Sequence, residues 1–176
     1  MNDELLREHD GRIGEAWSGE APNGSHINLV VARRGSPTAA AIVGALASPG
    51  PGHVPFLACP EPGSVVRPMT VVVNKSTING ERLGRMTWGA AQLGIAQGVL
   101  DAVAEGLLPA ESVDETVLLV AVWVDPTADD EPAVKEANRA ATRAAVADAL
   151  ASHSAASVME VVAARERAHN AFFGGS

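Results

Sequence analysis

The segment Thr116–Val124 (TVLLVAVWV) constrains the fold more than any other part of the chain. After its first residue it is apolar throughout, so it lacks the alternating polar positions of a strand that has one face in solvent. It is also too short to cross a bilayer as a helix. We therefore expect it to form the central strand of a sheet and to be buried on both faces.

Other segments have the β-branched composition or the alternation that is typical of strands. They are Ile13–Gly19, His26–Ala32, His53–Cys59 and Met69–Ile78. The predicted helices are residues 36–47, Arg85–Gly106, Asp129–Leu150 and Ser157–His169. The first of these helices has Ser36 as its N-cap and Pro37 at its first helical position. This order of elements predicts an α+β fold, a two-layer structure with helices packed on one face of a mixed sheet.

The predicted helix Arg85–Gly106 contains three interior glycines, Gly89, Gly94 and Gly98. Each glycine in a helix interior is less favourable than alanine by about 1 kcal/mol. We expect close packing of this helix against a sheet or a neighbouring subunit to explain them, with contact to a ligand as the less favoured alternative.

Length and charge exclude several classes of protein. The chain has 176 residues, which favours one domain, and we expect a polar N-terminal leader at 1–11 before a single domain at 12–176. Its net charge of −8 argues against binding to nucleic acid or to anionic membranes. The charged N-terminus lacks the apolar segment of a signal peptide. Together with the single cysteine, Cys59, these features predict a cytoplasmic protein.

No generic catalytic motif is visible in the chain. It has no glycine-rich phosphate loop, no paired-cysteine metal site and no nucleophile elbow. Its histidines lack the helical spacing of metal ligands, so we expect no metal.

Two polar pairs are more informative. His26 and Asn28 are two residues apart on one predicted strand, and Lys75 and Thr77 are two apart on another. Side chains with this spacing project from the same face of a strand. The pairs could line a polar pocket, or they could be the solvent faces of two half-exposed strands, which is the ordinary pattern of an antiparallel sheet.

From Ile13 to about Leu150 the chain resembles the formaldehyde-activating enzyme family. The resemblance is carried by IGEAWSGEAPNGSHINLVVARRGSP, FLACPEP, TVVVNKSTIN, WGAAQLGIAQGVLDAVAEGLLP and the run to ANRAAT. It implies an enzyme that joins formaldehyde to tetrahydromethanopterin, giving the methylene derivative and water. It also implies a left-handed βαβ crossover of the ribosomal-protein type and a homo-oligomer, a ring-shaped pentamer, with active sites between neighbouring subunits.

The resemblance assigns roles to individual residues. The histidine of the family's AHID strand, its general acid, falls on His26, and the Leu that contacts the pterin falls on Leu57. The Lys and Thr of its NKVT segment fall on Lys75 and Thr77, and the Gln after GPA falls on Gln92. Imidazole titrates near neutral pH, so it suits the protonation of a departing hydroxyl group. The resemblance implies that lysine, threonine and glutamine hold the pterin ring by hydrogen bonds.

The chain departs from the family pattern at several positions. Asn28 replaces the aspartate of the family's HID, so the strand face that carries His26 lacks one negative charge. The family aspartate also contacts substrate, so the replacement affects the binding site. The YNYEAT segment becomes ANRAAT, and the proline of GPAQ becomes Ala90. These changes predict a divergent paralogue. Alternatives to the condensing enzyme are a carrier or sensor of a pterin or formaldehyde adduct, an enzyme for another carbonyl, and a non-catalytic scaffold.

Overall fold

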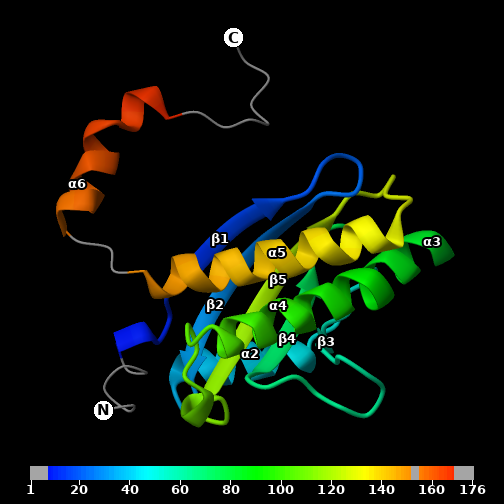
Figure 1. Ribbon diagram of the computed structural model, residues 1–176, viewed down its shortest axis with the longest axis horizontal. Coiled ribbons are helices and arrows are strands. Elements are labelled where there is room, and N and C mark those ends of the chain that lie inside the picture. Colours follow the sequence, from blue (N-terminus) through cyan, green and yellow to red (C-terminus); the bar gives the residue numbers. More distant parts are fainter. Residues whose placement is uncertain (1–7, 152–154, 169–176) are drawn as a thin grey trace.

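A five-stranded mixed sheet forms the centre of the protein, in the strand order β1-β2-β5-β4-β3. The computed structural model describes residues 8–151 and 155–168. The strands are β1 (Ile13–Ser18), β2 (Ser25–Arg33), β3 (Phe56–Leu57), β4 (Met69–Asn74) and β5 (Thr116–Val124). The middle strand β5 is antiparallel to β2 and parallel to β4 (Figure 1). The α+β fold with a mixed sheet and an apolar central strand is therefore confirmed.

Two of the helices, Pro37–Leu46 and Glu131–Leu150, begin at side-chain caps that the sequence indicates. The helices are α2 (Pro37–Leu46), α3 (Gly80–Gly84), η1 (Arg85–Ala91), α4 (Gln92–Ala104), α5 (Glu131–Leu150) and α6 (Ala155–Ala163). Short 3-10 turns occur at Ala110–Ser112 and Arg165–Arg167. The Ser36 side chain accepts a hydrogen bond from the Ala39 N–H of α2, and Asp130 accepts one from the Ala133 N–H of α5. Both caps satisfy backbone donors that have no partner inside the helix.

Helices α4 and α5 lie side by side on one face of the sheet (Figure 1). Buried side chains from alternate positions of the strands, such as Leu29, Leu118 and Val120, form one core with Ile95 of α4 and Val146 of α5. This layer contains most of the apolar core.

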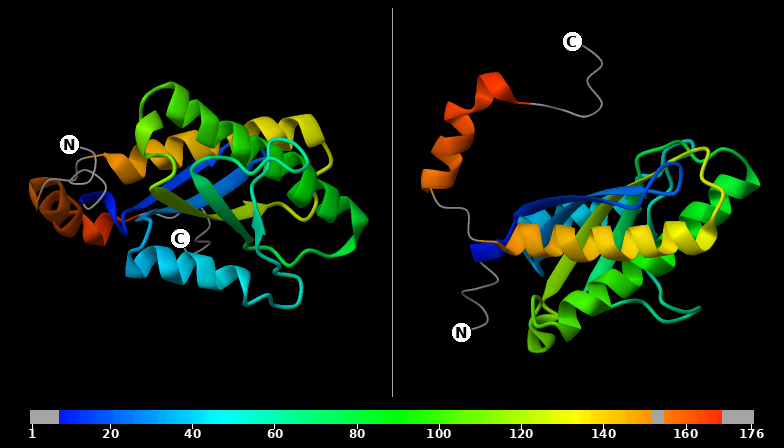
Figure 2. Two further views of the ribbon diagram at one scale, coloured as in Figure 1. Left: turned by 90° about the horizontal axis from the view of Figure 1, so that it is seen from below. Right: turned by 45° about the horizontal axis from the view of Figure 1, so that its top comes forward.

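Helix α2 lies on the opposite face of the sheet, so the prediction that the helices share one face is wrong. Its Ala39 and Ile42 form a second, smaller core with Ala32, Val71 and Val117. Those strand residues alternate with the ones that face α4 and α5, and Figure 2 (left) shows α2 across the sheet from the long helices. The helix is rich in alanine and only weakly amphipathic, so its sequence does not indicate which face it covers.

Several predicted elements have different bounds in the structure. The strand predicted at His53–Cys59 is reduced to β3, because Pro55 and Pro60 on either side cannot donate to a ladder. The strand predicted at Met69–Ile78 ends at Asn74. The single helix predicted at Arg85–Gly106 begins earlier, at Gly80, and its seven residues Arg85–Ala91 are a π-helix.

Two described segments near the ends of the sequence differ in how they contact the sheet. In the described part of the predicted leader, the carboxylate of Asp10 accepts hydrogen bonds from the Arg33 N–H and the Ser36 and Thr38 hydroxyls. Helix α6 stands away from the sheet (Figure 1) and exposes Val158, Met159, Val161 and Val162. The predicted end of this helix at His169 lies outside the described residues. No helix in 8–151 or 155–168 has the length and apolarity needed to cross a bilayer.

Candidate active site

The uncovered end of the α2 face carries a group of polar and aromatic side chains. Cross-strand pairing places Trp17, His26 and Trp123 in one row, and Glu15, Asn28 and Ala121 in the next. Residues that are directly paired across a sheet project from the same face. His26 and Asn28 share the face of Ala32, which packs under α2 at the other end of β2. The group therefore lies beyond the end of α2, on an open part of the sheet.

Lys75 completes this group from the far side of β5. Its backbone N–H donates to the Val122 carbonyl at 2.7 Å, which continues the pairing of β4 with β5 one residue past the strand. Its side-chain Nζ lies 2.8 Å from His26 Nδ1 and 2.8 Å from Asn28 Oδ1. On the opposite side of the ring, His26 Nε2 lies 2.5 Å from Glu15 Oε1.

These contacts define where protons lie. An ammonium group has donors only and a carboxylate has acceptors only. With Lys75 as an ammonium group and Glu15 as a carboxylate, Lys75 donates to Nδ1 of His26, and the N–H at Nε2 donates to Glu15. Burial lowers the pKa of Lys75 from its ordinary value, while the carboxylate of Glu15 opposes that shift.

A cavity of about 390 Å³ opens over these side chains, and its lining consists of Trp17, His26, Asn28, Lys75 and Trp123. The two indole rings are tilted against each other with their centroids 5.5 Å apart, and Trp17 is 43% exposed. The cavity thus joins an aromatic wall to a short chain of hydrogen-bonded polar groups.

Comparison with known proteins identifies the family of this chain. Residues 13–173 match the family model described as formaldehyde-activating enzyme (Fae). The chain belongs to the formaldehyde-activating enzyme family. A 5,6,7,8-tetrahydromethanopterin hydro-lyase of Methanosarcina barkeri is 38% identical over 160 residues, which are 91% of this chain and 89% of that protein.

Two further relatives are longer proteins. A bifunctional enzyme Fae/Hps of Archaeoglobus fulgidus is 35% identical over 139 residues, or 79% of this chain and 35% of that enzyme. A bifunctional enzyme Fae/Hps of Methanothrix thermoacetophila is 33% identical over 138 residues, or 78% of this chain and 35% of that enzyme. The matched part of this chain therefore corresponds to about a third of each bifunctional relative and to most of the hydro-lyase.

The structure brings together three of the residues that the family resemblance singled out, namely His26, Asn28 and Lys75. Thr77 instead lies in the loop beyond β4, where its hydroxyl is hydrogen-bonded to His53 Nε2 at 3.0 Å. Leu57 packs beside the α2 core. Gln92, the first residue of α4, is absent from the lining of the cavity.

Three residues of the site were not among those predicted. Glu15, Trp17 and Trp123 all contact the His26 ring or one another. Glu15 and Trp17 are two apart on the strand that precedes His26, which is the same spacing that drew attention to His26 and Asn28. Pairing the two predicted strands as a hairpin could have found Glu15 and Trp17, whereas Trp123 depends on the register of β5 against β2.

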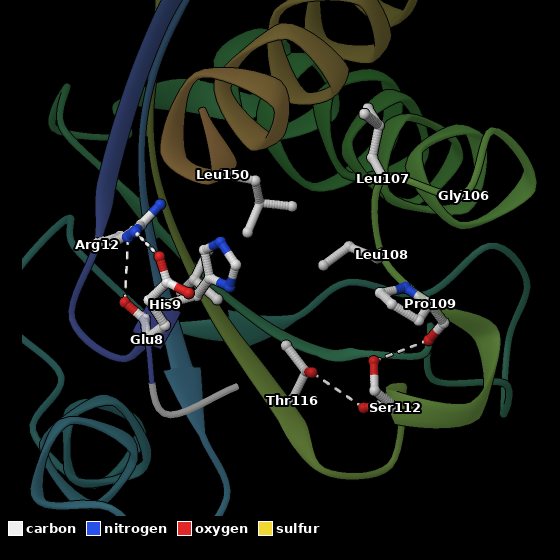
Figure 3. Close-up of a pocket in the computed structure, with 11 residues that line it drawn as sticks. Glu8, His9, Arg12, Gly106, Leu107, Leu108, Pro109, Ser112, Thr116 and Leu150 are labelled. Carbon is white, nitrogen blue, oxygen red and sulfur yellow. Dashed lines mark hydrogen bonds and ion pairs between the residues drawn. The ribbon is translucent and has the colours of Figure 1, made fainter. Parts of the chain in front are cut away.

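A second cavity, of about 550 Å³, lies at the other end of the molecule, beside the His9 ring and Leu108 (Figure 3). Its polar side chains bond one another or nearby backbone: Ser112 donates to the Pro109 carbonyl and Thr116 to the Ser112 carbonyl. Among the described residues, no group of three or more His, Cys, Asp or Glu is placed to hold a metal ion. Of these two cavities, the one at His26 combines an imidazole, a lysine and two indole rings.

Proposed function

We propose that this protein condenses formaldehyde with tetrahydromethanopterin, giving the methylene derivative and water, with His26 as the general acid. Family membership and the similarity to a tetrahydromethanopterin hydro-lyase support the reaction. The observation that carries the assignment to this site is the contact of His26 with both Lys75 and Glu15 in an open cavity. The pterin is a substrate in this reaction.

The chemistry suits the groups present. One pterin amine adds to the formaldehyde carbon and forms a carbinolamine. Its C–O bond then breaks as the departing oxygen takes a proton, which releases water and leaves an iminium ion. The second amine closes the methylene bridge and loses its own proton. The difficult event is departure of the hydroxyl group, and a positioned acid accelerates such a step by roughly 10²–10⁴-fold.

The pterin ring system is proposed to lie against the aromatic wall of the cavity. Trp17 and Trp123 offer a flat apolar surface beside the polar groups. Stacking on indole rings suits a planar heterocycle, and hydrogen bonds at its edge then fix its orientation. The amide of Asn28 and the ammonium group of Lys75 line the same cavity as these two rings.

We also propose that the complete site is shared between copies of the chain in a homo-oligomer, a pentamer. Within one chain, Gln92 and Thr77 lie outside the His26 cavity, as expected if a neighbouring copy supplies part of the pterin site. The exposed apolar residues of α6 also favour contact with another chain. The left-handed crossover between β4 and β5 and the cytoplasmic location stay predictions.

The decisive experiment measures methylene formation from formaldehyde and tetrahydromethanopterin above the spontaneous background. We expect clear acceleration by the wild-type protein and a loss of roughly 10²–10⁴-fold in His26→Gln. Glu20→Gln is a matched surface control, because Glu20 is exposed on the loop after β1. Binding of the pterin without acceleration would instead identify a carrier or sensor, and an unchanged rate in His26→Gln would remove His26 from the role of acid.

A further inference from the structure

Glu15 has a contact that the proposed reaction does not by itself explain. Its carboxylate Oε1 lies 2.5 Å from His26 Nε2, on the side of the ring opposite Lys75. The Glu15 side chain is 60% exposed and that of His26 is 26% exposed, so this contact forms at the mouth of the cavity. Glu15 pairs with Asn28 across the strands and therefore stands diagonally next to His26.

The position of Glu15 is fixed from behind by α5. A Cβ atom at Gly14 would lie 2.0 Å from the Ala145 carbonyl oxygen, so β1 approaches α5 more closely than any side chain would allow. The Glu15 N–H donates to Asp148 Oδ2 at 2.9 Å. These two contacts hold the β1 backbone at one place on the helix, and they set the direction in which the Glu15 side chain leaves the sheet.

His26 has one charged side chain on each side of its ring. Glu15 faces it from β1, Lys75 faces it from the end of β4, and Asn28 on its own strand is uncharged. From β5 the facing residue is Trp123, which carries no charge. A neutral imidazole that gives up its Nε2 proton becomes an unfavourable anion unless Nδ1 receives another proton. Lys75 is the donor at Nδ1.

We propose that Glu15, His26 and Lys75 form a proton relay, in which Glu15 is a positioning residue that holds the His26 proton on Nε2. The relay deepens the proposed function and rests on it. When the carbinolamine binds, its hydroxyl oxygen takes the place of the exposed Glu15 Oε1 beside Nε2. As the C–O bond breaks, the Nε2 proton passes to that departing oxygen and a Lys75 proton passes to Nδ1. Water leaves, His26 stays neutral and Lys75 becomes an amine. The proton lost by the second pterin amine on ring closure passes to Nε2, and the Nδ1 proton returns to Lys75. This restores the Nε2–H form of His26 and the Lys75 ammonium group, so the protons balance over one turnover.

Burial supports the last part of this scheme. It lowers the pKa of Lys75, so the ammonium group gives up a proton more readily than an exposed lysine does. The Glu15 carboxylate acts in the other direction and keeps Lys75 protonated before the reaction. Removing that carboxylate should therefore lower the pKa of Lys75 further, so that the ammonium group loses its proton at a lower pH than in the wild type.

The relay is tested by NMR titration of the full-length protein with ¹⁵N-labelled histidine and lysine, without substrate. In the wild type we expect His26 to carry its proton on Nε2 and to have a bare Nδ1, as judged by the two ring nitrogen shifts. In Glu15→Ala the Lys75 ammonium group should titrate at lower pH than in the wild type. A wild-type His26 protonated on Nδ1, or an unmoved Lys75 titration in Glu15→Ala, would overturn the relay.

Turnover supplies the second readout. We expect Glu15→Ala to lower kcat by roughly 10- to 100-fold with a smaller change in KM, and Glu15→Asp to recover part of the loss. The alkaline limb of its pH profile should move to lower pH. Glu20→Gln should behave as wild type in both experiments, and circular dichroism confirms folding. A wild-type kcat and pH profile in Glu15→Ala would contradict the relay. If the wild type does not accelerate condensation at all, the proposed function fails, while the NMR titration still decides the relay.

Discussion

Lys75 reaches His26 across the full width of β5, the strand that separates β4 from β2. The two side-chain nitrogens lie 2.8 Å apart although their strands are not neighbours. Adjacent strands are about 4.8 Å apart, so the contact spans two such spacings. Ala121 of β5, paired with Asn28 on one side and with Val73 on the other, is small enough to leave this path open. A flexible four-carbon side chain over a small residue therefore joins two strands into one site.

Replacement of Lys75 should lower activity without lowering the free energy of unfolding near neutral pH. Lys75→Met removes the donor at His26 Nδ1, and we expect condensation to fall by roughly 10²–10⁴-fold. Burial lowers the pKa of Lys75, so between that lowered value and the ordinary 10.5 the unfolded chain binds more protons than the folded one. The stability of the wild type therefore rises with pH through this window. Urea unfolding should show that Lys75→Met lacks this rise and is at least as stable as wild type near neutral pH.

Asn28→Asp provides the opposite change at the same lysine. The new carboxylate would stand where Asn28 Oδ1 now lies, 2.8 Å from Lys75 Nζ. An adjacent negative charge favours the ammonium form, so the pKa of Lys75 should rise. The alkaline limb of the condensation rate should then move to higher pH. A limb that stays in place or moves to lower pH would show that Lys75 does not govern it.

The aromatic wall can be tested through intrinsic fluorescence. The chain has three tryptophans, of which Trp17 and Trp123 line the cavity and Trp88 does not. We expect titration with tetrahydromethanopterin to quench wild-type fluorescence and to quench Trp88→Phe by a larger fraction. In the double variant Trp17→Phe/Trp123→Phe the quenching should largely disappear and binding should weaken. Equal fractional quenching in both variants would place the pterin elsewhere.

Much of the fold follows from local sequence signals, because burial and capping act over short distances. The apolar run of β5 predicts a central strand, and Ser36 with Pro37 predicts the start of α2. The face that α2 covers could not be predicted, because it depends on which alternate strand residues, such as Ala32 and Val71, are left uncovered by the longer helices. The π-helical turn at Arg85–Ala91 likewise has no local signal of its own.

The site was predictable in part for a similar reason. The spacing of His26 and Asn28 indicates a shared strand face, and the resemblance adds Lys75. The role of Glu15 depends on the register of β1 against β2, which is set by the loop between them and by packing of Gly14 on α5. Although Asn28 lacks the charge of the family's aspartate, the carboxylate of Glu15 lies 2.5 Å from the His26 ring.

An ion pair between the two long helices should give the protein part of its resistance to acid. Arg139 donates to both carboxylate oxygens of Asp101, from Nε at 2.5 Å and Nη2 at 2.8 Å. The hydrogen bond from Arg139 lowers the pKa of Asp101, so its contribution is complete above about pH 4 and is lost as the pH falls through the lowered value. Because both side chains are partly exposed, we expect Asp101→Asn to lose about 0.5–1 kcal/mol at pH 7.

Urea unfolding between pH 7 and pH 2 measures this contribution. The difference in unfolding free energy between wild type and Asp101→Asn should shrink as the pH falls. Glu81→Gln is the control, because Glu81 pairs with Arg85 at 3.3 Å on the surface and is 90% exposed. A constant difference between Asp101→Asn and wild type at all pH values would exclude the ion pair as its source.

The glycines of the long helical segment should differ sharply in their tolerance of alanine. A Cβ at Gly94 would lie 2.1 Å from the Lys135 carbonyl oxygen, and one at Gly98 would lie 2.5 Å from that of Arg139. Close packing is thus present at these two positions, but the partner is the helix α5, whereas a sheet or a neighbouring subunit was predicted. Since backbone atoms cannot move aside cheaply, each alanine must push α4 and α5 apart, and we expect a loss of about 1–3 kcal/mol.

Gly89 provides the internal control for this prediction. It is exposed, and within the chain no atom lies within 4 Å of a Cβ added there, so no packing inside one copy of the chain limits this position. Gly89→Ala should therefore stabilise the protein by about 0.5–1 kcal/mol, because it removes the conformational freedom of glycine from the unfolded chain. Thermal and urea unfolding of the three variants measure the expected losses of stability at Gly94 and Gly98 and the expected gain at Gly89. If Gly94→Ala were as stable as Gly89→Ala, the separation of α4 from α5 would not be limited by these backbone contacts, and the helices would have to be packed more loosely than the structure shows.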